Sequence, residues 1–336
     1  MGGFLRRHKR VIPYALLAPG LLWLVFFYVL PGFQMLLTSF WSGTLETGYE
    51  FALSNVSNYS DALVKYSAQF GRSILYGGLA TLLTFAISYP LAYTIAFRGG
   101  RYKNLLLFLV VAPFFTSFLL RTISWKIILG DTGILLGPLK DIGLLPDEFR
   151  LLATPAAVIF GITYNFLPFM TLPIYVSLEK IDGRLVEAAK DLYAGPWRPG
   201  GTIGGTIIGG LVGVGLGLAL SYDALVIGIV GALVGTIIGT FFVSESILRV
   251  VLSLSLPGVF AGSLLTFIPA MGDFVNAALL GNTQTRMIGN VIQSRFLENN
   301  DYPTAAALSF ILMAAILAMV AIYARILGTD ELTSAR

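Results

Sequence analysis

The residues best suited to chemistry in this chain are a few polar side chains that interrupt long apolar runs. Tyr164 and Asn165 lie inside one run, Arg121 ends the run FFTSFLL, and Asp273 follows Gly272 near the end of another. A polar or ionisable residue at membrane depth is a functional candidate by default, because removing it from water is costly. We therefore select Tyr164, Asn165, Arg121 and Asp273 as candidate functional residues.

Each candidate also has a structural alternative. Tyr164 and Asn165 could form hydrogen bonds between helices. Asp273 could cap a helix or orient the chain at the membrane face. Arg121 could snorkel to the outer interface, guard an entrance or pair with an acid such as Asp273. The sequence alone leaves these alternatives open.

Several kinds of chemistry are excluded by what the chain lacks. It has no cysteine, and its one histidine, His8, lies in a basic N-terminal cluster. No G-x-x-x-x-G-K-[ST] motif occurs, and the glycines of 200–239 have no lysine to reach a phosphate. A membrane-embedded enzyme would need paired carboxylates, histidines or an exposed serine constellation, which the apolar runs lack. We therefore predict a non-catalytic chain with no metal site and no cofactor.

Composition places these residues in a membrane protein. Of 336 residues, 56% are hydrophobic and 12% are charged, about half the charged share of soluble domains. A bilayer takes roughly 20 helical residues to cross. Six segments qualify, at about 12–38, 72–97, 104–128, 152–177, 254–274 and 304–327. The first is too long for a signal peptide and lacks a cleavage site, so we expect an uncleaved span, and prolines within the spans predict kinks.

Lysine and arginine in short loops predict the orientation of these spans. If the spans alternate, one side receives Arg6, Arg7, Lys9, Arg10, Arg98, Arg101, Lys103, Lys180, Arg184, Lys190, Arg198 and Arg325. The opposite loops, at about 41–71, 129–151 and 275–303, are longer and more polar, although they also contain some basic residues. We expect the basic side, with both termini, to be cytoplasmic.

A polar segment, 178–198, lies between the fourth and fifth spans and reads LEKIDGRLVEAAKDLYAGPWR. Leu185, Ala188, Ala189 and Leu192 repeat at helical spacing and form a small apolar face. A short helix with such an alanine-rich face can lie close in a groove of another protein. It could equally lie on the lipid headgroups as an interfacial helix.

A glycine-rich apolar stretch, 199–245, follows this segment. Glycines recur every four residues in two rows, the first formed by Gly201, Gly205, Gly209, Gly213 and Gly217, and the second by Gly231, Gly235 and Gly239. Such rows allow two helix backbones to approach closely in a membrane. They predict a hairpin of two further spans, about 202–220 and 224–243, with Asp223 as a cap at the turn. The alternative is a flexible loop lying on the membrane.

Several motifs in order carry a family resemblance. LEKID precedes EAAKDL, and further motifs are YNFLPFMTLPIY at 164–175, LPGVFAGSLLTFIPAMGDFV at 256–275, LLGN at 279–282 and IGNVIQSRF at 288–296. Together they resemble permease subunits of type I ABC importers, in the spermidine/putrescine branch. The resemblance covers nearly the whole chain apart from about 199–245.

The resemblance implies an all-α, six-helix permease core in the inner membrane of a prokaryotic cell, paired with a second, homologous permease subunit. It also implies a cytoplasmic ABC ATPase dimer and an extracytoplasmic solute-binding protein as partners, and no nucleic acid. The EAA segment would be a coupling helix whose ATPase-docking residues are Glu187, Ala188, Ala189, Asp191 and Leu192, followed by Tyr193 and Gly195. In such a permease, Tyr164, Asn165, Arg121 and Asp273 would be the candidates for lining the translocation path. Because polyamines are cations, carboxylates and aromatic faces along this path would suit them.

The sequence departs from the family pattern at three places, all near the coupling segment. Tyr193 stands where the family has a glycine, with Gly195 two residues late, and Ser253 replaces a proline before the fifth span. The third departure is the insertion, which divides a permease domain of 1–198 and 246–336 and gives about eight spans in total. These departures support the alternative of a non-transporting scaffold or regulatory subunit derived from a permease.

Overall fold

The computed structural model describes residues 12–143, 145–192 and 250–327, and isolated positions between the last two ranges at 209–210, 228, 231–232 and 235–236. The chain divides into two compact units. One contains Met1–Ser67 and Val291–Ala315, and the other contains Ala68–Asn290 and Ile316–Arg336.

The described helices match the six predicted core spans. Five are long and apolar enough to cross a membrane: Leu16–Thr38, Ser67–Arg98, Pro155–Glu179, Leu252–Met271 and Tyr302–Arg325. A bent pair, Gly100–Phe115 and Phe118–Ile128, gives a sixth if it is counted as one span. The two further spans predicted at about 202–220 and 224–243 fall almost entirely outside the described residues.

The first unit is built around the N-terminal helices and a small hairpin. Its elements are α2 (Ile12–Leu24), a π-helical turn η1 (Val25–Val29), α3 (Leu30–Thr38), β1 (Trp41–Thr44), β2 (Gly48–Phe51), α4 (Ser57–Lys65), η7 (Ser294–Glu298) and the start of α16 (Tyr302–Leu327). The antiparallel strands pair Trp41 with Phe51 and Thr44 with Gly48. This hairpin is a short exception to the all-α prediction.

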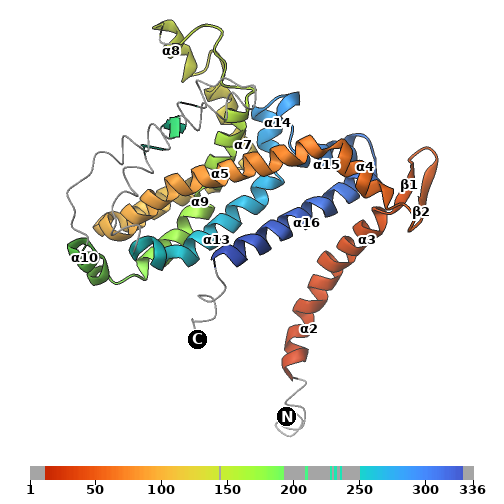
Figure 1. Ribbon diagram of the computed structural model, residues 1–336, viewed down its shortest axis with the longest axis horizontal. Helices are drawn as coiled ribbons and strands as arrows, with labels where there is room; N and C mark the ends of the chain where they lie inside the picture. Colours follow the sequence, from red (N-terminus) through yellow and green to blue (C-terminus); the bar gives the residue numbers. More distant parts are fainter. Residues whose placement is uncertain are drawn as a thin grey trace. The chain divides into compact units, whose positions relative to one another are not determined.

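The second unit holds most of the apolar core. Its elements are α5 (Ser67–Tyr93), η2 (Thr94–Arg98), η3 (Gly100–Tyr102), α6 (Lys103–Val111), η4 (Ala112–Phe115), α7 (Phe118–Ile128), α8 (Leu136–Asp141), α9 (Pro155–Glu179), α10 (Gly183–Leu192), α13 (Leu252–Met271), α14 (Val275–Leu280), η6 (Thr283–Thr285) and α15 (Ile288–Gln293), which ends in the first unit. Figure 1 shows α9 and α13 packed along each other within this unit.

The third predicted span, 104–128, is broken next to Pro113, one of the prolines that were expected to kink the spans. Pro113 lies in the 3₁₀ turn η4, and Thr116 then adopts an extended backbone with ψ of 150°. The helices on either side of this break meet at 93°. Because proline cannot donate a helical hydrogen bond and crowds the preceding turn, the apolar run bends here while remaining apolar throughout.

Small residues allow α9 and α13 to approach closely. A Cβ atom at Gly258 would lie 2.5 Å from the carbonyl oxygen of Pro173, and one at Gly262 would lie 3.0 Å from that of Met170. At the start of α9, the Thr154 hydroxyl accepts a hydrogen bond from the Ala157 amide, and Pro155 occupies the first helical position. The Thr154 cap therefore defines where α9 begins, and close backbone contact at Gly258 and Gly262 positions α9 against α13.

Candidate translocation path and coupling segment

A buried polar network joins three elements of the second unit. Asn165 of α9 donates from Nδ2 to Thr122 Oγ1 of α7 at 3.2 Å and to Asn276 Oδ1 of α14 at 3.1 Å. Thr122 Oγ1 lies 3.4 Å from the same Asn276 oxygen. Exposed fractions are 0% for Thr122 and Asn276 and 1% for Asn165. Asn165 therefore forms hydrogen bonds between helices, which was one of the two roles considered for it from the sequence.

Asp273 extends this network. Its carboxylate accepts from the Asn276 backbone amide at 2.8 Å and from Asn276 Nδ2 at 2.7 Å, so it caps the start of α14. The residue is 7% exposed. Burial raises the pKa of Asp273 to about 6, and the hydrogen bonds from Asn276 oppose that rise. The geometry agrees with the capping role proposed from sequence.

Arg121 and Tyr164 lie among aromatic rings. The Arg121 guanidinium carbon is 4.5 Å from the Phe114 ring centroid, and the Tyr164 ring meets Trp125 edge-on with centroids 5.1 Å apart. Within the described residues, Arg121 forms no ion pair with Asp273, and its Nε and Nη1 atoms have no hydrogen-bond partner. Arg121 therefore contributes a half-buried cation next to aromatic faces.

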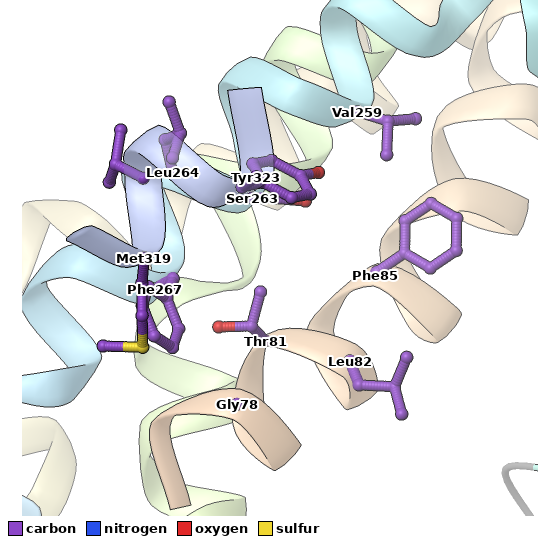
Figure 2. Close-up of a pocket in the computed structure, with 11 residues that line it drawn as sticks. Gly78, Thr81, Leu82, Phe85, Val259, Ser263, Leu264, Phe267, Met319 and Tyr323 are labelled. Atoms are coloured by element: carbon purple, nitrogen blue, oxygen red, sulfur yellow. The ribbon is translucent and has the colours of Figure 1, made fainter. Parts of the chain in front are cut away.

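A cavity of about 460 Å³ lies elsewhere in the second unit, between α5, α13 and α16. Figure 2 shows Phe85, Val259, Phe267 and Met319 around it, with the hydroxyls of Thr81, Ser263 and Tyr323 nearby. Neither Asn165 nor Asp273 lines this cavity, and its walls carry no charged side chain. A cation would find no opposite charge here, so the cavity is a poor match for a polyamine path.

The predicted docking segment forms a helix, α10, with a defined anchor. The Asp182 carboxylate accepts from the Arg184 amide at 3.0 Å in the first turn. Val186 is 4% exposed and packs in the same core cluster as Leu178 of α9, whereas Leu185 is 52% exposed. From the sequence, Leu185 was expected on the apolar face of this helix, and Val186 was not. One buried residue does not produce a repeat at helical spacing.

The docking residues that can be located lie on the exposed side of α10. Glu187, Ala188 and Asp191 are exposed. The side chains of Ala189 and Leu192, and the whole of Tyr193 and Gly195, lie outside the described residues. Two carboxylates and an alanine are thus exposed on this helix, and their docking role stays a prediction.

An ion pair joins the base of α9 to α6. Lys103 Nζ lies 2.7 Å from Glu179 Oε1 and 5.3 Å from the Tyr175 ring centroid. Glu179 is the last residue of α9, and α10 follows after a short connection. From the sequence, Lys103 served only to predict the orientation of the spans, since contacts between spans leave no trace in the distribution of charges.

The predicted glycine rows can be checked at only a few positions. A Cβ atom at Gly209 would overlap the carbonyl oxygen of Gly231 and lie 2.9 Å from the Gly235 Cα. These backbones therefore lie in close contact. The remaining predicted packing positions, Gly201, Gly205, Gly213, Gly217 and Gly239, lie outside the described residues.

Curated relatives match almost the full chain. The Haemophilus influenzae spermidine/putrescine transport system permease protein PotB is 34% identical over 90% of this chain and 90% of its own length. PotB of Escherichia coli is 32% identical over 90% of this chain and 93% of its own length. The E. coli inner membrane ABC transporter permease protein YdcU is 24% identical over 99% of this chain and 95% of its own length.

A solved structure shares the fold. A chain of a bacterial ABC transporter involved in the import of the acidic polysaccharide alginate superposes with a TM-score of 0.61 and 17% identity. The match covers 96% of this chain and 98% of that chain. No protein-family model matches the sequence.

Proposed function

The chain belongs to the PotB family of ABC importer permease subunits, which are non-catalytic and act with a separate ATPase subunit; from this premise we propose that it forms part of a membrane path for spermidine, putrescine or a related small solute. The observation that carries the proposal is the 34% identity to a spermidine/putrescine permease over 90% of the chain. The helical spans and the permease fold support it.

The proposed complex contains this chain, a second homologous permease, a cytoplasmic ATPase dimer and an extracytoplasmic solute-binding protein. Both chain termini lie in the cytoplasm. In this complex α10 is the coupling helix, and its exposed residues Glu187, Ala188 and Asp191 contact the ATPase. Ala189, Leu192, Tyr193 and Gly195 complete the docking surface. Rigid-body motion of the ATPase subunits then reaches the spans through α10.

The proposed path uses the aromatic and polar side chains of α7 and α9. Tyr164 and Trp125 contact each other edge-on, and aromatic rings of this kind can bind a protonated amine. Arg121 is a cation that lies over the Phe114 ring, so it would oppose the approach of a polyamine on its own side. Asn165 and Asp273 support the path through the buried network, since their side chains are engaged with Thr122 and Asn276.

We also propose that 199–245 is an inserted hairpin of two spans, giving eight in total. The close approach of Gly209 to Gly231 and Gly235 supports it, because small-xxx-small rows pack in this way. A hairpin that leaves the cytoplasm and returns to it preserves the orientation of α13 and α16.

Uptake of radiolabelled spermidine by cells carrying the whole system tests coupling. Glu187→Ala removes a proposed ATPase contact, and we expect at least a roughly tenfold loss of uptake, since interface hot spots cost ~2 kcal/mol. Glu46→Ala, which changes an exposed glutamate in the β1–β2 connection, is the matched control and should transport normally. Uptake that survives Glu187→Ala would contradict the coupling role.

The scaffold alternative predicts a different result. It is favoured by Tyr193, Ser253 and the insertion, all of which depart from the family pattern near the coupling helix. In that case the intact complex would not take up spermidine, and deleting 199–245 would either restore uptake or leave it absent. Uptake by the intact complex rules this alternative out.

A further inference from the structure

The Thr122–Asn165–Asn276–Asp273 network, called the hub below, links elements that are far apart in the sequence. Thr122 belongs to α7, the second half of the broken span, and Asn165 belongs to α9. Asn276 belongs to α14, and Asp273 lies just before that helix. Their exposed fractions do not exceed 7%. Buried polar contacts therefore connect these three helices.

Asn276 is the centre of the hub. Its Oδ1 accepts from Asn165 and lies within hydrogen-bond reach of the Thr122 hydroxyl, while its amide groups donate to Asp273. Asn165 uses both Nδ2 protons, one toward α7 and one toward α14. The amide nitrogen of Asn165 has two partners, while its buried Oδ1 accepts no hydrogen bond among the described residues. The directional bonds that are made fix the relative position of the helices more narrowly than apolar packing does.

The backbone of α9 is shaped to admit α14. A Cβ atom added at Gly161, one turn before Asn165, would lie 2.7 Å from Asn276 Oδ1. At the other end of α14, the Ala153 amide donates to the Leu280 carbonyl oxygen at 2.8 Å, and Asn282 Nδ2 donates to the Ala153 carbonyl oxygen at 2.7 Å. The start of α14 is therefore bonded to α9, and its end is bonded to the segment that leads into α9.

The same α9 leads directly to the proposed coupling helix. It ends at Glu179, and α10 begins at Gly183. Asn165 lies fourteen residues before Glu179, or about 21 Å along a helix axis. A displacement of α10 thus acts on one end of a continuous helix that holds the hub in its other part, with Pro168 and Pro173 between the two.

We propose that the hub passes the motion of α9 to α7 and α14, so that Thr122, Asn165 and Asn276 are positioning residues for transport. The inference rests on the proposed function, because it requires α10 to be the coupling helix. If the hub loosens, ATP hydrolysis moves α9 without moving α7 and α14 in step. The observable consequence is more ATP hydrolysed for each solute molecule imported.

The test uses the complete complex in proteoliposomes, comprising this chain, the second permease, the ATPase dimer and the solute-binding protein. ATP hydrolysis and uptake of labelled spermidine are measured in the same preparation. Thr122→Val keeps the side-chain shape and removes the hydroxyl, whereas Thr122→Ser keeps the hydroxyl. We expect Thr122→Val to raise the ATP-to-spermidine ratio about threefold, the change expected from losing one hydrogen bond within a membrane. Asn165→Leu removes two hydrogen bonds and should raise the ratio further. Thr122→Ser should restore the wild-type ratio.

Thr171→Val is the matched control. Thr171 is also a buried α9 residue, but its hydroxyl bonds to Ser88 Oγ of α5 at 2.9 Å and so lies outside the hub. The ATP-to-spermidine ratio of Thr171→Val should equal that of the wild type. The inference is overturned if Thr122→Val keeps the wild-type ratio, if Thr171→Val raises the ratio equally, or if uptake and hydrolysis fall in proportion. Absence of uptake by the wild-type complex would instead overturn the proposed function.

Discussion

At Asp273, burial and hydrogen bonding act in opposite directions on one carboxyl group. Burial dominates and raises its pKa to about 6, although Asn276 donates to both carboxylate oxygens. No lysine or arginine among the described residues forms an ion pair with it. Its negative charge is therefore stabilised by amide dipoles alone, which makes the surrounding fold sensitive to pH.

The raised pKa gives a prediction for stability. Because the folded-state pKa exceeds the unfolded value, Asp273 favours the folded state at low pH, and this contribution is lost as pH rises through about 6. Between pH 7.5 and pH 5, the wild type should gain ~1.4 kcal/mol relative to Asp273→Asn, which cannot titrate. Thermal unfolding of the detergent-solubilised protein at both pH values measures the difference. An equal response of the two proteins would show that Asp273 is not buried.

Residue types identified part of the hub but not its connections. Asn165 and Asp273 stood out because they interrupt or end apolar runs. Thr122 and Asn276 did not, since threonine is common in spans and Asn276 falls beyond the fifth one. The hydrogen bonds themselves span up to 154 positions of sequence, as between Thr122 and Asn276. Contacts of that range depend on tertiary packing, which a single sequence does not display.

At the level of elements, apolar length predicts spans well because the bilayer sets a minimum for helix length. It does not predict whether a span runs straight or bends. The run 104–128 stays apolar across the break at Thr116, so its 93° bend has no hydropathy signal beyond Pro113. Short elements were missed for a related reason. The β1–β2 hairpin, α4, α8 and α14 are too brief to show periodicity.

The α9–α13 contact gives a prediction at this scale. Gly258→Ala would place a Cβ 2.5 Å from both the Pro173 carbonyl oxygen and Ser177 Cβ, so the helices must separate. We expect a loss of ~1–3 kcal/mol in stability, as for overpacked cores. Gly71→Ala in α5 is the matched control, because nothing lies within 4 Å of its added Cβ.

Fluorescence-detected gel filtration after heating measures both variants. Gly258→Ala should lose its monodisperse peak at a lower temperature than the wild type. Gly71→Ala should match or slightly exceed the wild type, since alanine favours the helix. Equal behaviour of the two variants would mean that α9 and α13 are not in backbone contact.

For the whole molecule, the number and orientation of spans determine where each surface can act. The first span, Leu16–Thr38, buries none of its apolar window within the described structure. Family membership and fold are supported along nearly the full chain, because the relatives cover 90% of it and the solved importer chain 96%.

The inserted hairpin gives a topological prediction. If 199–245 crosses the membrane twice, a cysteine at Tyr222 should react with an impermeant maleimide from outside, and the chain offers no native cysteine to interfere. A cysteine at Glu187 is the matched control and should react only after the membrane is permeabilised. Labelling of Tyr222→Cys only from the cytoplasm would contradict the two extra spans.

ATP-dependent uptake of labelled spermidine into proteoliposomes that contain the complete complex directly tests the proposed transport function. We expect uptake that requires the solute-binding protein and ATP, falls when unlabelled putrescine competes, and is unaffected by a neutral sugar. A properly assembled complex that hydrolyses ATP but takes up no spermidine or putrescine would contradict it.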